Sequence, residues 1–126
     1  MKNIINAEVL MDSTTTSIFV FGIYLIFVGA GFLLIPNILL PLFRFPKTDE
    51  PWIRVMAILV LIIAYFYLVA AHHNILPIYW ATVYGRFFVF LSFTVLVLTK
   101  KSQPMLLIFG IVDALGAVWT LLTLLS

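Results

Sequence analysis

The chain has 126 residues, of which 64% are hydrophobic and 10% are charged, with a formal net charge of +2 and no cysteine. Polar side chains are too few to cover a water-soluble domain of this size, so the composition predicts an integral membrane protein. The small charge excludes an electrostatic nucleic-acid-binding surface, and the lack of cysteine excludes disulfides, thiolate nucleophiles and cysteine-ligated metal centres.

Four apolar runs, each close to the roughly 20 residues that a helix needs to cross a hydrocarbon core, follow one another along the chain. They cover residues 17–35, 52–71, 78–98 and 105–125. These runs predict an all-α fold, a four-helix membrane bundle that forms a single transmembrane domain over residues 1–126.

The N-terminal segment and the first run carry two further signals. Residues 1–16 lack the pattern of a cleaved signal peptide, because Glu8 and Asp12 interrupt the apolar stretch, and we expect a short interfacial helix or a disordered tail. Gly22 and Gly29 are seven residues apart, which predicts a helix face that a neighbouring helix approaches closely.

The connection over residues 36–51 mixes prolines, apolar residues and charges. We expect it to lie in the membrane interface, with Phe43 and Phe45 dipped into lipid and Arg44 and Lys47 at the headgroups.

The second run begins with a typical helix start. Thr48 or Asp49 is expected to cap it, and Trp52 and Arg54 are expected to contact the interface. Three alanines at seven-residue spacing predict a second small-residue packing face: Ala57, Ala64 and Ala71.

His72 and His73 stand between the second and third runs. Adjacent side chains on a helix diverge by about 100°, so the pair does not match the i, i+4 spacing of two metal ligands. We predict a solvated turn and no metal site, with contact to a metal, haem or quinone as the alternative.

Two charges are predicted to be deep in the membrane, Arg86 in the third run and Asp113 in the fourth. At about 1.5 Å per residue their depths differ by a few Å, so we predict a buried ion pair, with Thr82 and Tyr84 as further candidate site residues. Three interpretations remain open: a structural ion pair, a proton- or ion-coupled site, and an anion-binding site at Arg86.

The basic residues of the short loops predict the orientation. Arg44 and Lys47 follow the first run, Lys100 and Lys101 follow the third, and the opposite side has only Lys2. Basic loops stay cytoplasmic, which predicts that both termini face outward from a cell membrane, the inner or plasma membrane.

The stretch GAGFLLIPNILLPLFRFPKTDEPWIRVMAILVLIIAYFYLVAA, followed by a helix with a mid-membrane arginine, resembles the small four-helix bacterial membrane proteins grouped as DoxX-like. The resemblance covers the first three helices. It implies a bacterial inner-membrane protein of four helices, and some members are associated with respiratory or sulfur-redox complexes. No catalytic residue is carried over from it.

No serine-nucleophile motif, phosphate-binding loop or pair of catalytic carboxylates is present, so we predict no catalytic residue and no cofactor. The leading expectation is a non-enzymatic protein that contacts lipid and forms a homo-oligomer or an accessory subunit of a larger membrane complex. The alternative is a small transporter or channel that uses Asp113 and Arg86. A redox or quinone-handling enzyme comes third, based on the histidines and tyrosines.

Overall fold

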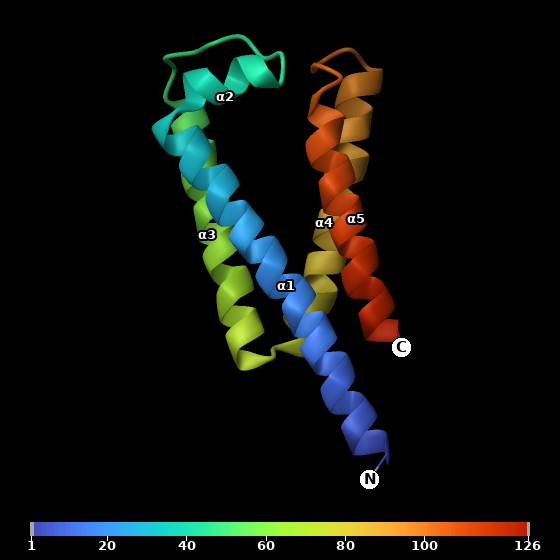
Figure 1. Cartoon of the computed structure of the whole chain (residues 1–126). Coiled ribbons are helices and arrows are strands. Elements are labelled where there is room, and N and C mark those ends of the chain that lie inside the picture. The colour runs from blue at the N-terminus through green and yellow to red at the C-terminus, as the bar shows by residue number, and fades with distance from the viewer. Residues whose placement is uncertain (1, 126) are drawn as a thin grey trace.

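The computed structural model describes the backbone of residues 2–125 and the side chains of residues 13–125. The described chain is built from helices: α1 Lys2–Leu34, α2 Pro36–Leu42, α3 Trp52–His73, α4 Leu76–Leu98 and α5 Leu106–Leu125 (Figure 1). Four of them are long and apolar enough to cross a membrane, α1 through its part Ser13–Leu34. This confirms the all-helical, four-span prediction and a multi-pass membrane protein, with span ends within four residues of those expected.

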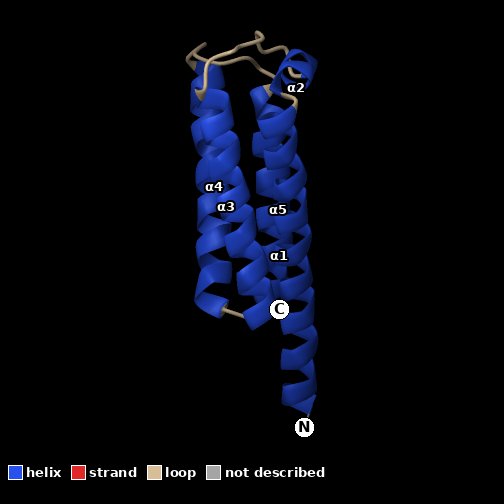
Figure 2. Cartoon of the chain, turned by 90° about the vertical axis from the view of Figure 1, so that its left-hand side faces the viewer, coloured by secondary structure: helices blue, strands red, loops and turns tan. Residues whose placement is uncertain are grey.

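The helices form two pairs that diverge like the arms of a V. Helix α1 packs along α3, α4 packs along α5, and the main contact between the pairs is that of α1 with α5. The pairs meet near the α3–α4 turn and separate toward α2 (Figure 1). In the view turned by 90°, the long helices run lengthwise beside one another and α2 lies across the end (Figure 2). We call the α3–α4 end the narrow end and the α2 end the wide end; both termini lie toward the narrow end.

The α1–α3 contact uses small residues from the two faces that the sequence predicts for close helix packing. A Cβ atom on Gly29 would lie 2.7 Å from Leu61 Cγ and 3.2 Å from the Ala57 carbonyl oxygen. On α3, Ala57 and Ala64 have no exposed surface. The missing side chains let the two helices approach, which confirms both predicted packing faces.

The N-terminal segment differs from the expectation. Helix α1 begins at Lys2 and continues without a break to Leu34, so the segment before Ser17 forms neither a separate interfacial helix nor a disordered tail. Residues 2–16 contain no proline and no glycine to interrupt the helix once the membrane span has nucleated it.

The connection from α1 to α3 also differs in detail. It contains the short helix α2, which starts at Pro36, where the fixed proline φ suits a first turn. Helix α3 has Pro51 as its N-cap, with no side-chain cap hydrogen bond, so neither Thr48 nor Asp49 caps it. Thr48 stands three residues before that cap and its hydroxyl instead accepts a hydrogen bond from the Glu50 N–H at 3.1 Å.

Candidate functional site

Arg86 lies on α4 near the middle of the bundle, with 2% of its surface exposed. Its Nε donates to the Thr82 carbonyl oxygen at 3.1 Å, and its Nη2 donates to Thr82 Oγ1 at 3.1 Å and to Thr120 Oγ1, on α5, at 2.9 Å. Thr82, predicted as a site residue, therefore contacts the guanidinium directly.

The hydroxyls behind these contacts have a defined direction. Ser17 Oγ, on α1, donates its single proton to the Thr14 carbonyl oxygen at 2.7 Å, so in its 2.8 Å contact with Thr120 it is the acceptor. Thr120 thus donates to Ser17 and turns its lone pairs to Arg86. Thr14 adds a 2.8 Å hydrogen bond to Thr123 Oγ1 on α5. We call Thr14, Ser17, Thr82, Thr120 and Thr123 the hydroxyl cluster; it joins α1, α4 and α5 at the narrow end and supplies oxygen dipoles to a buried cation.

Aromatic faces complete the environment of Arg86. Its Cζ lies 4.9 Å from the ring centroid of Phe21 and 5.8 Å from that of Tyr67, within the range of cation–π attraction. A Cβ on Gly116 would lie 2.9 Å from the Phe21 ring and 3.2 Å from Arg86 Nη1. Gly116 therefore leaves the space in which the ring and the guanidinium lie against α5.

The direct ion pair predicted between Arg86 and Asp113 is not formed: no nitrogen–oxygen contact within 4.0 Å joins these two described side chains, and Arg86 Nη1 is buried without a hydrogen-bond partner. The cause is the direction in which helical side chains lean. They tilt toward the N-terminus of their own helix, and α4 and α5 are antiparallel. Arg86 consequently reaches back to Thr82 at the narrow end, while Asp113 leans toward the wide end.

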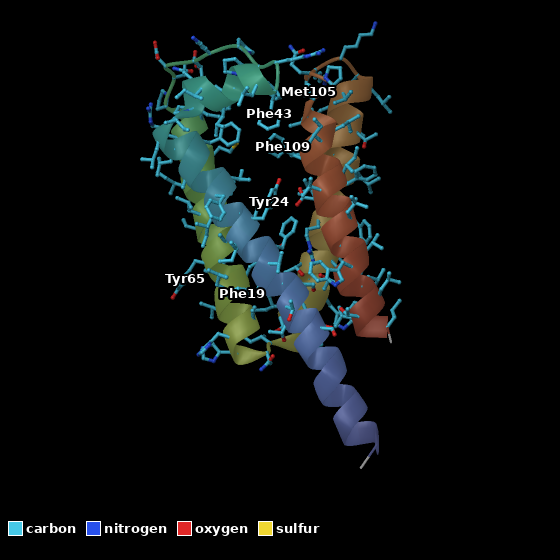
Figure 3. The ribbon with its side chains drawn as sticks, in the orientation of Figure 1. Phe19, Tyr24, Phe43, Tyr65, Met105 and Phe109 are labelled. Atoms are coloured by element: carbon cyan, nitrogen blue, oxygen red, sulfur yellow. The ribbon has the colours of Figure 1, made fainter. Side chains whose placement is uncertain are left out.

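Asp113 lines a cavity of about 250 Å³ between the two helix pairs. All five helices contribute to its walls, which are otherwise apolar or aromatic and include Tyr24, Phe32, Phe93, Phe109 and Trp52. Asp113 is the one charged residue among these lining residues. Figure 3 shows Tyr24 of α1 and Phe109 of α5 projecting into the space between the pairs.

The rings at the wide end face the protein. The ring of Phe43 lies 4.6 Å from that of Phe109, and Phe45 packs with it against the buried cluster that includes Phe32. This arrangement differs from the expected insertion of Phe43 and Phe45 into lipid. Helix α2 lies across the wide end (Figure 2), and its Leu40, together with Phe45 of the connection, lines the cavity.

The predicted interfacial residues occupy different positions. Arg44 and Lys47 are exposed in the connection after α2. Arg54 Nε donates to the Leu33 carbonyl oxygen at 3.2 Å, satisfying the end of α1. Trp52 is 51% exposed and also lines the cavity.

Two other candidates lie away from the cavity. Tyr84 is 68% exposed on the outer side of α4, with its ring 6.4 Å from that of Trp80, so it does not join Arg86. His72 and His73 are in the last turn of α3 rather than in the turn after it, and both are exposed. The described residues contain no group of three or more histidines or carboxylates able to hold a metal ion.

Comparisons with protein-family models, curated proteins and solved structures find no match to this chain. The DoxX-like resemblance is neither supported nor opposed by this result and stays a prediction.

Proposed function

We propose that the protein is an integral membrane protein that binds a lipid-like small molecule in the cavity between its two helix pairs. The observation that carries this proposal is the cavity itself: about 250 Å³ walled by aromatic and aliphatic side chains, with one carboxylate at its wall. Concave, mostly apolar spaces with a few placed polar groups are typical of small-molecule sites.

The size of the cavity limits its occupant. An apolar cavity of about 150 Å³ accommodates benzene, so a space of about 250 Å³ corresponds to about ten non-hydrogen atoms. An eight-carbon chain with a single polar end group has that size. Such a molecule partitions into the bilayer and reaches a cavity between transmembrane helices from the lipid.

The expectations of an oligomer or accessory subunit, and of a transporter, are retained as alternatives. In the subunit alternative, an apolar side chain of a partner fills the same cavity, and the protein co-purifies with that partner. In the transport alternative, a solute passes from the cavity to the hydroxyl cluster, and Phe21, which contacts both Arg86 and the cavity residue Tyr24, has to move aside.

Trp52 provides a direct test because it lines the cavity. In a variant with Trp80→Phe and Trp119→Phe, Trp52 is the remaining tryptophan, and 8-bromooctan-1-ol in lipid nanodiscs is the quencher. We expect quenching that saturates with the concentration of the alcohol. Val60 lines the cavity, so the larger side chain of Val60→Phe should fill part of it and weaken binding of the alcohol at least fivefold.

Val55→Phe is the matched control, because Val55 is on the same helix, 54% exposed, and outside the cavity lining. It should leave the quenching curve unchanged. Linear quenching that is identical in both variants would show only bilayer partitioning and contradict the proposal.

We further propose the orientation that the basic loops predict, with both termini outside the cytoplasmic (inner or plasma) membrane. A cysteine introduced at Asn74 should react with an impermeant thiol reagent in intact cells, whereas one at Lys101 should be protected. The reverse labelling pattern would invert the orientation.

A further inference from the structure

We infer that the end group recognised in the cavity is a protonated amine, so that the ligand class is that of amphipathic alkylamines. The inference rests on the proposed binding function and adds its chemical selectivity. It starts from the position of Asp113, a half-buried carboxylate on the cavity wall.

Asp113 has no direct cationic partner within the described chain. Arg86, the nearest candidate, makes no ion pair with it, because the guanidinium is turned back to the oxygens of Thr82 and Thr120. A carboxylate inside a membrane protein is costly unless a charge or hydrogen-bond donor answers it. A ligand ammonium supplies both the charge and up to three N–H donors.

The walls near the carboxylate also suit a cation. Tyr24 and Phe93 are among the aromatic residues that line the cavity with Asp113. Aromatic faces attract ammonium groups, and sites that combine several rings with a carboxylate recognise amines. The remaining walls, including Val28 and Val60, are aliphatic and match an alkyl chain.

Arg86 acts against this preference, because its positive charge lies on the same side of α5 as Asp113. The attraction of the ammonium to Asp113 nevertheless exceeds its repulsion by Arg86, because the ammonium contacts the carboxylate directly. The guanidinium is held more than 4.0 Å from that carboxylate by its hydrogen bonds to oxygens and by the ring of Phe21. Coulomb attraction in a low-dielectric interior falls with distance, so the direct contact dominates. An anionic end group in the cavity does not reach Arg86, which is not among the lining residues, and it meets the like charge of Asp113.

Competition binding tests the selectivity. Octylamine, octanol and octanoate have the same chain and differ in the end group, and each is used to displace 8-bromooctan-1-ol from the Trp52 reporter in nanodiscs of zwitterionic lipid. We expect octylamine to bind at least tenfold more tightly than octanol, and octanoate to bind most weakly. In Asp113→Asn the ratio of amine to alcohol affinity should fall to about one.

Asp49→Asn is the matched control. It removes the same charge from an exposed position in the connection before α3, and it should preserve the amine preference. An amine-to-alcohol ratio near one in the Trp52 reporter with Asp113 intact, or a ratio that survives Asp113→Asn, overturns the inference and leaves the proposed function standing. Failure of all three compounds to displace the quencher would mean that the proposed function itself is wrong. Because the Trp52 reporter with Asp113 intact gives a decisive ratio by itself, the test does not depend on the folding of Asp113→Asn.

Discussion

Arg86 illustrates how a buried charge is accommodated without an opposite charge in contact. Its hydrogen bonds go to oxygens of Thr82 and Thr120, and its flat face meets the rings of Phe21 and Tyr67. Hydrogen bonds to a charged group contribute about 1.5–3 kcal/mol each in water-soluble proteins, and interhelical bonds in membranes average about 0.6 kcal/mol. Several such contacts together stabilise the guanidinium in place of the ion pair with Asp113 that the sequence predicts.

The hydroxyl cluster should therefore matter more for stability than Asp113 does. Thr120→Val removes one of the two acceptors of Arg86 Nη2 and the donor to Ser17, and we expect it to lower the free energy of unfolding by about 1–2 kcal/mol. Asp113→Asn should cost less than this, because it breaks no direct ion pair. Reversible unfolding in mixed detergent measures both variants.

Thr94→Val is the matched control for this series, since among the described residues Thr94 Oγ1 hydrogen-bonds only the Phe90 carbonyl oxygen of its own helix, at 2.8 Å. Its effect should stay within about 0.5 kcal/mol. If Asp113→Asn lowered the free energy of unfolding more than Thr120→Val does, Asp113 and not the hydroxyl cluster would be the main partner of Arg86.

The site could be predicted only in part at this scale. Charge and burial identify Arg86 and Asp113 as neighbours across two helices, and both indeed lie in the interior. Their side chains lean in opposite directions, which follows from the antiparallel arrangement and not from residue depth. No sequence motif identifies Gly116 or Ser17. Their roles follow from their contacts in the folded chain, Gly116 with the Phe21 ring and Ser17 with Thr120.

Helices α1 and α3 share the most extensive helix–helix contact of the described chain. Gly29 lies directly against Leu61 and the backbone of Ala57, so that even one methyl group has no room. Small residues at seven-residue spacing are a strong sequence signal for close packing, which is why both faces could be predicted, although the sequence does not say that they pack on each other. The α4–α5 pair has a weaker signal, in which Gly110, Asp113, Ala117 and Thr120 form a small-and-polar stripe.

We expect Gly29→Ala to destabilise the bundle by about 1–3 kcal/mol through overpacking. Gly85→Ala is the corresponding change at an exposed helical position with no atom within 4 Å of the added Cβ. It should be neutral or stabilising by up to about 1 kcal/mol, because alanine favours the helix more than glycine does. Equal effects of the two substitutions, measured by thermal denaturation in detergent, would contradict close α1–α3 packing.

At the scale of the whole molecule, the four spans follow from hydropathy and length, whereas the V shape does not. Apolar runs predict that helices cross the membrane, but the angle between two pairs depends on which side chains meet. Here the hydroxyl cluster draws the pairs together at one end, and bulky rings such as Phe32 and Phe109 hold them apart at the other. The cavity arises from this difference between the two ends.

The central claim is that this cavity accommodates a small amphipathic molecule, and the methionine methyl groups report on it without any substitution in the cavity. Met56 lines the cavity, whereas Met105, at the same end of the bundle, does not. The measurement is the nuclear Overhauser effect between the chain protons of octanol and carbon-13-labelled methionine methyls, in nanodiscs of deuterated lipid. We predict a saturable effect at Met56 that is absent at Met105. Contact with Met105 alone, or an equal and unsaturable effect at both methyls, would show that the alcohol remains in the lipid and that the cavity is not a binding site.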